Sequence, residues 1–211
     1  MKIGILGGSF NPAHDGHLHI SLLAIKKLNL DQLWWIPTKY NPFKNQISYL
    51  SYQQRLEDCQ NFVKKHPKII VKNFAEIYTI NLISRLQKSH KNHEFLWIMG
   101  ADNFENFHRW KNFTKLIKLL PIAIFSRDDY LAKIRKTKAW HIYQTKKNSL
   151  PKLINHFNNF NHFVNFPQKN NFSNNLRTPQ NPKSLPQFLT FNSKNLAISS
   201  RQIRQNLNKK I

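Results

Sequence analysis

The chain has 211 residues, which is the size of one α/β domain with at most a small appendage. Its 33 Lys and Arg residues against 10 Asp and Glu give a formal net charge of +23, and the basic residues are scattered and form no single block. The one cysteine, Cys59, excludes an internal disulfide, and the sequence has no apolar run long enough to span a membrane. We therefore expect a cytoplasmic protein with no membrane partner and no dedicated nucleic-acid partner, whose charge reflects a Lys- and Asn-rich composition.

Short apolar runs alternate with amphipathic segments along the chain. The apolar runs predict buried strands at 2–6, 33–37, 69–71, 95–99, 122–125 and 188–191. Helical spacing of apolar residues predicts helices at 16–28, 51–65, 78–88 and 113–120, and a last helix from Ser199 or Ser200 to about Asn208. Strands that alternate with helices indicate an α/β fold in a single domain over 1–211, a doubly wound parallel sheet with helices on both faces.

The segment 131–187 has no clear period. Much of it is rich in Asn, Lys, Pro and Gln, which is typical of a long loop, yet it also carries repeated Phe residues, which argue against full disorder. We expect a variable, partly ordered cover within the same domain.

The strongest motif is GGSFNPAHDGH at 7–17, where the first predicted strand meets the first predicted helix. Open α/β sheets bind ligands at this end of their strands. The paired glycines allow a phosphate to approach the backbone, and the start of the helix supplies N–H groups. His14 and His17 could then face one bound anion and stabilise charge on a transferring phosphoryl group. A histidine pair could instead ligate a metal, but no third ligand cluster accompanies it, so we expect no metal held by the protein.

The second motif is ISSRQIR at 198–204. Ser199 and Ser200 offer hydroxyls and the N–H groups of a helix start, while Arg201 and Arg204 offer guanidinium groups suited to phosphates. Serine caps and surface arginines are common, so this motif gains meaning only beside the first one.

The two motifs resemble the N- and C-terminal signatures of the HxGH-type nucleotidyltransferase superfamily. Within it, the chain resembles the bacterial nicotinate-nucleotide adenylyltransferases in three further segments, PTKYNPFK at 37–44, EIYTINLISRL at 76–86 and MGADNFENFHRW at 99–110. The resemblance covers about residues 1–130 and 188–205. It implies a Rossmann-like sheet and transfer of the adenylyl group of ATP, with its bound Mg²⁺, to nicotinic acid mononucleotide, giving nicotinic acid adenine dinucleotide and pyrophosphate.

The resemblance also implies roles for individual residues. The residues that would carry the chemistry are His14, His17, Lys44 and Arg204. Those that would bind ATP are Gly8, Ser9, Phe10, His14, His17, Gly100, Asp102, Ser199, Ser200 and Arg204. Those that would bind the acceptor are Lys44, Tyr78, Thr79 and Trp110, with Trp110 stacking on the pyridine ring. Trp110 could also be a core residue, since Phe104, Phe107 and Phe113 crowd the same segment.

Two departures from the family pattern stand out. Phe43 replaces the histidine of the usual Pro-His-Lys, and Arg201 replaces the usual threonine of the C-terminal motif. The sequence leaves open another adenylyltransferase of the superfamily, with nicotinamide mononucleotide or phosphopantetheine as acceptor, as well as a cytidylyltransferase and a basic RNA-binding protein. It also leaves homo-oligomerisation open.

Overall fold

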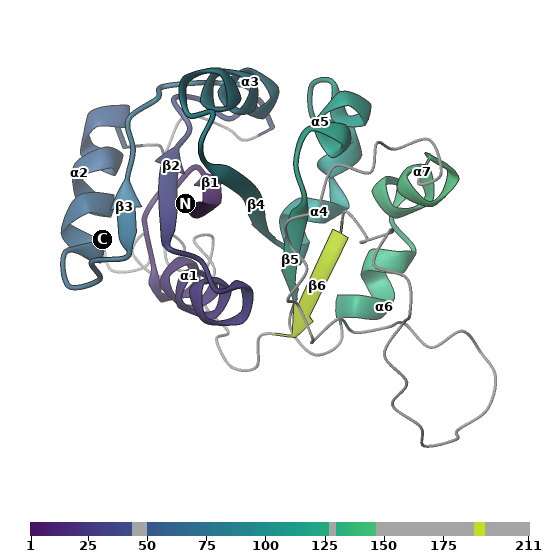
Figure 1. The fold of residues 1–211 in the computed structure, drawn as a ribbon, viewed down its shortest axis with the longest axis horizontal. Coiled ribbons are helices and arrows are strands. Elements are labelled where there is room, and N and C mark those ends of the chain that lie inside the picture. The colour runs from purple at the N-terminus through teal and green to yellow at the C-terminus, as the bar shows by residue number, and fades with distance from the viewer. Residues whose placement is uncertain (44–49, 127–129, 147–187, 193–211) are drawn as a thin grey trace, which may run out of the picture.

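The computed structural model describes residues 1–43, 50–126, 130–146 and 188–192. The strands of these residues form one parallel sheet in the order β3-β2-β1-β4-β5-β6 (Figure 1). They are β1 (Lys2–Gly8), β2 (Gln32–Pro37), β3 (Ile69–Val71), β4 (Glu94–Gly100), β5 (Ile122–Ser126) and β6 (Phe188–Asn192). This is the strand order of the Rossmann-type doubly wound sheet, so the predicted fold class and all six predicted strands are confirmed.

Four of the observed helices match the predicted ones to within a few residues at each end, namely α1 (Asp15–Leu28), α2 (Tyr52–Val63), α3 (Thr79–Ser89) and α5 (Phe113–Leu119). The sequence analysis missed α4 (Ala101–Glu105), the 3₁₀ turn η1 (Phe107–Arg109), α6 (Tyr130–Arg135) and α7 (Lys138–Lys146). The last two give regular structure to the start of the segment 131–187. The predicted helix after Ser199 lies outside the described residues.

Alternating strand residues build a core on each face of the sheet. On one face, residues such as Ile5 and Trp97 pack with buried residues of α3 and α5. On the other face, residues such as Leu6 and Ile98 pack with buried residues of α1 and α2. Figure 1 shows α3 and α5 on one side of the sheet and α1 on the other. The predicted cover on both faces is therefore confirmed, and it explains why the strands read as nearly continuous apolar runs.

The strand register aligns the carboxyl ends of the strands. Gly8 at the end of β1 pairs with Pro37 at the end of β2, and Gly100 at the end of β4 pairs with Phe125. The loops that follow these strands consequently emerge at the same edge, where a doubly wound sheet binds its ligands. None of the described helices is long and apolar enough to cross a membrane.

Candidate active site

The loop after β1 turns at Phe10. Its φ of 46° lies in the left-handed region, which is uncommon for a residue with a side chain. The Phe10 ring is 1% exposed and stacks on Trp35, with 4.9 Å between ring centroids. The buried ring therefore anchors the loop to the core on the α1 face.

The two glycines before this turn belong to β1, so the strand runs two residues further than predicted. A Cβ on Gly7 would lie 2.4 Å from Cη2 of Trp97, whereas the nearest described atoms to a Cβ on Gly8 belong to the Phe10 ring, the first at 3.4 Å. Neither glycine has a positive φ. Gly7 is thus required by the packing of Trp97, whereas Gly8, the last residue of β1, has no such close contact with the core.

His14 and His17 lie side by side at the start of α1, as the motif predicted. His14 is the N-cap of the helix, and its Nδ1 accepts a hydrogen bond from the Gly16 N–H at 3.1 Å. An imidazole that accepts at Nδ1 carries its proton on Nε2, so His14 has an N–H donor at that atom. The centroids of the two rings are 3.8 Å apart, and the His17 ring also contacts Phe10 at 4.6 Å. The helix start, with its N–H groups and positive dipole end, therefore carries two imidazoles in contact, tilted by 35° to each other.

Gly100 and Asp102 lie at the end of β4 and the start of α4. Gly100 is the N-cap of α4, and Asp102 is an exposed residue in its first turn. A Cβ on Gly100 would lie 2.5 Å from Oδ1 of Asp102 and 4.0 Å from Cδ1 of Ile20 in α1. The end of β4 thus lies beside the helix that carries His17, and the Asp102 carboxylate folds back over Gly100.

Trp110 closes the turn η1 and is half-buried. Its ring meets Trp97 edge-on, with centroids 6.1 Å apart, and meets Phe107 edge-on at 5.1 Å. Trp110 packs against the core on the α3 face without being buried in it. The structure therefore gives Trp110 two aromatic supports while leaving part of its surface accessible.

The segment before α3 approaches the same turn. Tyr78 is the N-cap of α3 and Thr79 its first residue, and both are half-buried. The Lys111 ammonium, one residue after Trp110, lies 4.2 Å from the centre of the Tyr78 ring. Arg109, one residue before Trp110, lies 5.1 Å from the centre of the Phe43 ring. The Lys111 side chain thus connects the start of α3 to the segment that carries Trp110, and Arg109 and Lys111 are two cations that the sequence analysis did not single out.

Arg55 is a second feature that the sequence analysis missed. It is 2% exposed and donates hydrogen bonds to the carbonyl oxygens of Ser9, Thr38, Lys39 and Leu50. Its position four residues before Cys59 on α2 would have placed it on the buried face of that helix.

The remaining predicted site residues are Ser9, Lys44, Ser199, Ser200 and Arg204. Ser9 is buried, and its Oγ accepts a hydrogen bond from Asn41 Nδ2 at 3.4 Å. Lys44 and the three residues of the C-terminal motif lie outside the described residues. Among the residues that the structure describes, no group of three or more His, Cys, Asp or Glu side chains could hold a metal ion.

Comparison with known proteins places this geometry in a family. Residues 5–206 match the family model described as cytidylyltransferase-like. A probable nicotinate-nucleotide adenylyltransferase of Agrobacterium fabrum is 38% identical over 131 residues, which are 60% of this chain and 70% of that protein. Its counterpart in a Ruegeria species is 36% identical over 147 residues, which are 68% of this chain and 77% of that protein.

A solved structure supports the fold. The structure of Plasmodium falciparum nicotinic acid mononucleotide adenylyltransferase complexed with NaAD has a TM-score of 0.61 and 18% identity, and the match covers 97% of this chain and 82% of that one. At that identity the likeness concerns the fold alone. Because the family model spans most of the chain and the relatives match over most of their own length, the chain belongs to the cytidylyltransferase-like family and, within it, to the nicotinate-nucleotide adenylyltransferases.

Proposed function

We propose that this protein transfers the adenylyl group of ATP to nicotinic acid mononucleotide, giving nicotinic acid adenine dinucleotide and pyrophosphate. The observation that carries the proposal is the pair of His14 and His17 rings in contact at the N-terminus of α1, just after the first strand of the sheet. Such a site is suited to anions, because N–H donors and the positive end of the helix dipole point at the same place. The relatives are named as probable nicotinate-nucleotide adenylyltransferases, which supports nicotinic acid mononucleotide as the acceptor.

On the ATP side, the proposal assigns the phosphates to the loop at 8–10 and to the two imidazoles. Gly8 leaves room for a phosphate at the end of β1, and the Nε2–H of His14 supplies a donor. Gly100 and Asp102 would hold the ribose. Ser199, Ser200 and Arg204 would close on the triphosphate from the C-terminal motif.

The reaction needs no general base. An oxygen of the 5′-phosphate of the mononucleotide attacks the α-phosphorus of ATP, and the bond to the bridging oxygen breaks as pyrophosphate leaves. The attacking oxygen is already anionic at neutral pH, so the barrier lies in bringing two polyanions into line. Positioning can supply roughly 7–11 kcal/mol of that barrier. Donors such as His14, His17, Lys44 and Arg204 stabilise the charge that develops on the leaving pyrophosphate.

Mg²⁺ enters this proposal as part of the substrate. The described residues contain no acidic or histidine cluster for a resident ion, whereas ATP phosphate oxygens bind Mg²⁺ readily. The proposal also includes a single nucleotidyltransferase domain over 1–211. It further includes a cytoplasmic location, with which the free thiol of Cys59 agrees.

On the acceptor side, the nicotinate carboxylate would bind at Tyr78 and Thr79, where α3 begins. The pyridine ring would stack on Trp110, which its neighbours Trp97 and Phe107 hold in place. Lys111 adds a positive charge beside Tyr78. A charge-assisted hydrogen bond is worth about 1.5–3 kcal/mol, so we expect at least a tenfold preference for the acid over the amide.

The test is a pyrophosphate-release assay at saturating ATP with nicotinic acid mononucleotide, nicotinamide mononucleotide and phosphopantetheine as acceptors, and with CTP as an alternative donor. We expect the acid mononucleotide and ATP to give the highest kcat/KM. Trp110→Ala should weaken both pyridine acceptors, while Trp110→Phe keeps an aromatic face and most of the affinity. Equal kcat/KM for the acid and the amide would refute the acceptor assignment, and turnover with CTP alone would refute the donor.

A further inference from the structure

We infer that the first turn of α2 holds both substrate loops, with Arg55 as the positioning residue for the phosphate loop and Tyr52 for the acceptor loop. The phosphate loop is residues 9–13, and the acceptor loop is residues 72–78, between β3 and α3. The names of the two loops rest on the proposed function, whereas the contacts of Arg55 and Tyr52 with these loops are independent of it.

Arg55 ties the phosphate loop to its neighbours. Its Nη1 donates to the carbonyl oxygen of Ser9, and its Nη2 donates to those of Thr38 and Lys39 at 3.0 and 3.1 Å. Its Nε donates to the carbonyl of Leu50 at 3.2 Å, just before the helix. Only a guanidinium has enough donors in one plane to bond four carbonyl oxygens from one buried position.

The burial of Arg55 also has an electrostatic consequence. Burying a cation is costly, and hydrogen bonds to carbonyl oxygens offset that cost. The Arg55 charge lies within hydrogen-bonding distance of the Ser9 carbonyl and inside the protein, where it is screened less than in water. Arg55 therefore favours an anion bound at the phosphate loop as well as fixing the loop itself.

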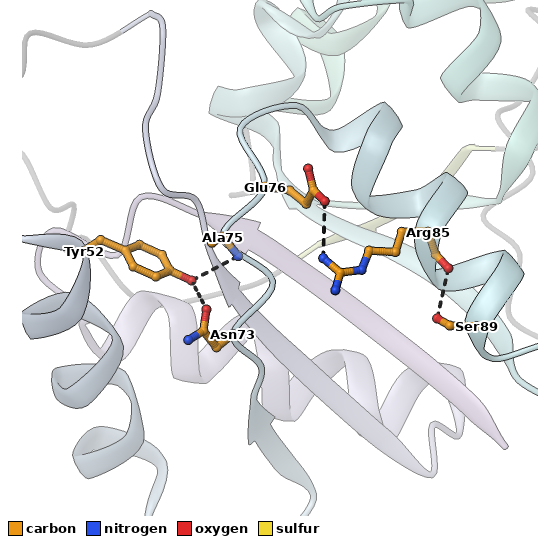
Figure 2. Close-up of polar contacts among 6 residues, drawn as sticks. All are labelled: Tyr52, Asn73, Ala75, Glu76, Arg85 and Ser89. Carbon is orange, nitrogen blue, oxygen red and sulfur yellow. Dashed lines mark hydrogen bonds and ion pairs between the residues drawn. The ribbon is translucent and has the colours of Figure 1, made fainter.

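Tyr52 makes the matching contact with the acceptor loop, as Figure 2 shows. Its hydroxyl donates to Asn73 Oδ1 at 2.8 Å and accepts from the Ala75 N–H at 3.2 Å. Ala75 has a φ of 50°, a left-handed conformation that is strained for a residue with a Cβ. The Tyr52 hydroxyl thus bonds the backbone at the strained point of the loop, three residues before Tyr78.

The two anchors belong to one rigid unit. Tyr52 and Arg55 are one helical turn apart, and the Arg55 guanidinium lies 5.6 Å from the centre of the Tyr52 ring. Ser51 caps the helix by accepting from the Gln54 N–H at 3.1 Å, and the Leu50 N–H donates to Asn11 Oδ1 in the phosphate loop at 3.1 Å. The start of α2 therefore touches the loops after β1, β2 and β3, and it sets the separation of the loops proposed to hold the two substrates.

The other side of the acceptor loop contacts α3. Arg85 of α3 forms an ion pair with Glu76 at 3.5 Å (Figure 2), and its guanidinium lies 5.4 Å from the centre of the Phe74 ring. The Arg85 side chain is 59% exposed, and exposed ion pairs of this kind contribute little. The acceptor loop therefore has a second contact, on α3, which Tyr52→Phe leaves in place.

The experiment compares Tyr52→Phe, Arg55→Lys and a control, Gln53→Ala. Gln53 is an exposed residue of the same turn, and its side chain donates to Glu57 along the helix, at 2.8 Å. Tyr52→Phe removes both hydrogen bonds of the Tyr52 hydroxyl, and the loss of even one hydrogen bond changes an equilibrium about fivefold. For Tyr52→Phe we expect the KM of nicotinic acid mononucleotide to rise about fivefold or more with the KM of ATP within about twofold. For Arg55→Lys we expect the KM of ATP to rise about fivefold or more and kcat to fall, with the KM of nicotinic acid mononucleotide within about twofold. For Gln53→Ala we expect no change in kcat or in either KM.

Hydrogen exchange of the backbone amides, measured by mass spectrometry, provides a readout that does not depend on the substrate. Tyr52→Phe should speed exchange about fivefold in residues 72–78 alone, and Arg55→Lys should do so in residues 9–13 and 38–40. Unchanged exchange in both loops, or equal changes in both KM values for either variant, would overturn the inference. If the wild type fails to use nicotinic acid mononucleotide while the exchange pattern is as expected, the proposed function fails and the role of α2 stands.

Discussion

Alanine substitutions at the adjacent residues Gly7 and Gly8 should have different effects. Gly7→Ala should destabilise the fold, whereas Gly8→Ala should weaken ATP binding and leave stability nearly unchanged. In Gly7→Ala, the new Cβ would lie 2.4 Å from Cη2 and 2.8 Å from Cζ2 of Trp97. Carbon atoms pack at about 3.5–4.0 Å, so the indole must move by about 1 Å. Trp97 is 2% exposed and is held edge-on against Trp110, and it belongs to the core on the α3 face. The strain cannot be relieved by a flexible chain end, and we expect a loss of about 1–3 kcal/mol in the free energy of unfolding.

Gly8→Ala is the matched control. The nearest described atom to its Cβ would be in the Phe10 ring, at 3.4 Å, a contact that a small shift of the ring accommodates. We expect the free energy of unfolding to change by less than about 0.5 kcal/mol, within the usual range for substitutions away from the core. The added methyl would instead obstruct the proposed phosphate site, so we expect a higher KM for ATP.

The measurement is urea unfolding of both variants and the wild type, with the midpoint and the slope fitted separately, followed by the KM of ATP for each folded protein. A Gly7→Ala protein as stable as the wild type would refute the packing argument. A Gly8→Ala protein with unchanged KM for ATP would remove Gly8 from the ATP site.

Three further outcomes follow from individual contacts. His14→Ala removes both the imidazole and the N-cap hydrogen bond from Gly16, so it should lose about 1 kcal/mol of stability and most turnover. His14→Asn keeps a capping side chain and should lose turnover alone. Equal stability of the two variants in urea would contradict the capping role of His14. His17→Ala should fold normally and lower kcat by about two to three orders of magnitude, and wild-type turnover would end its phosphate role. Burial raises the pKa of Cys59 to about 12, from 9.0, so the folded thiol stays protonated and should react far more slowly with an aromatic disulfide reagent at pH 8 than the unfolded chain does. The same shift gives a stability contribution that is present below about pH 9 and is lost as the pH rises through 9–12, which urea midpoints at pH 8 and pH 10 would detect.

The sequence analysis identified the strands as apolar runs, and the central strands β1, β2, β4 and β5 are mostly buried because helices cover both faces of the sheet. It missed α4, η1 and α6, which have 5, 3 and 6 residues, because they are too short to show a clear period. It missed α7, which has 9 residues, because this helix lies in the segment 131–187, where no clear period was found. It ended the first strand at residue 6 and assigned Gly7 and Gly8 to the motif that follows, whereas both glycines complete β1 and the chain turns at Phe10. Gly7 is needed in the strand because Trp97 occupies the place of a Cβ.

The sequence by itself determined what depends on near neighbours. The strand-to-helix junction, the three-residue spacing of His14 and His17 and the alternation of strands and helices are all local patterns. Only the tertiary structure decided which loops meet at the edge of the sheet. The bond from Arg55 to the Ser9 carbonyl joins residues 46 apart, and the contact of Lys111 with Tyr78 joins loops that follow different strands. Such contacts depend on strand order and register, which arise when the two faces of the sheet are buried together, and no short stretch of sequence encodes them.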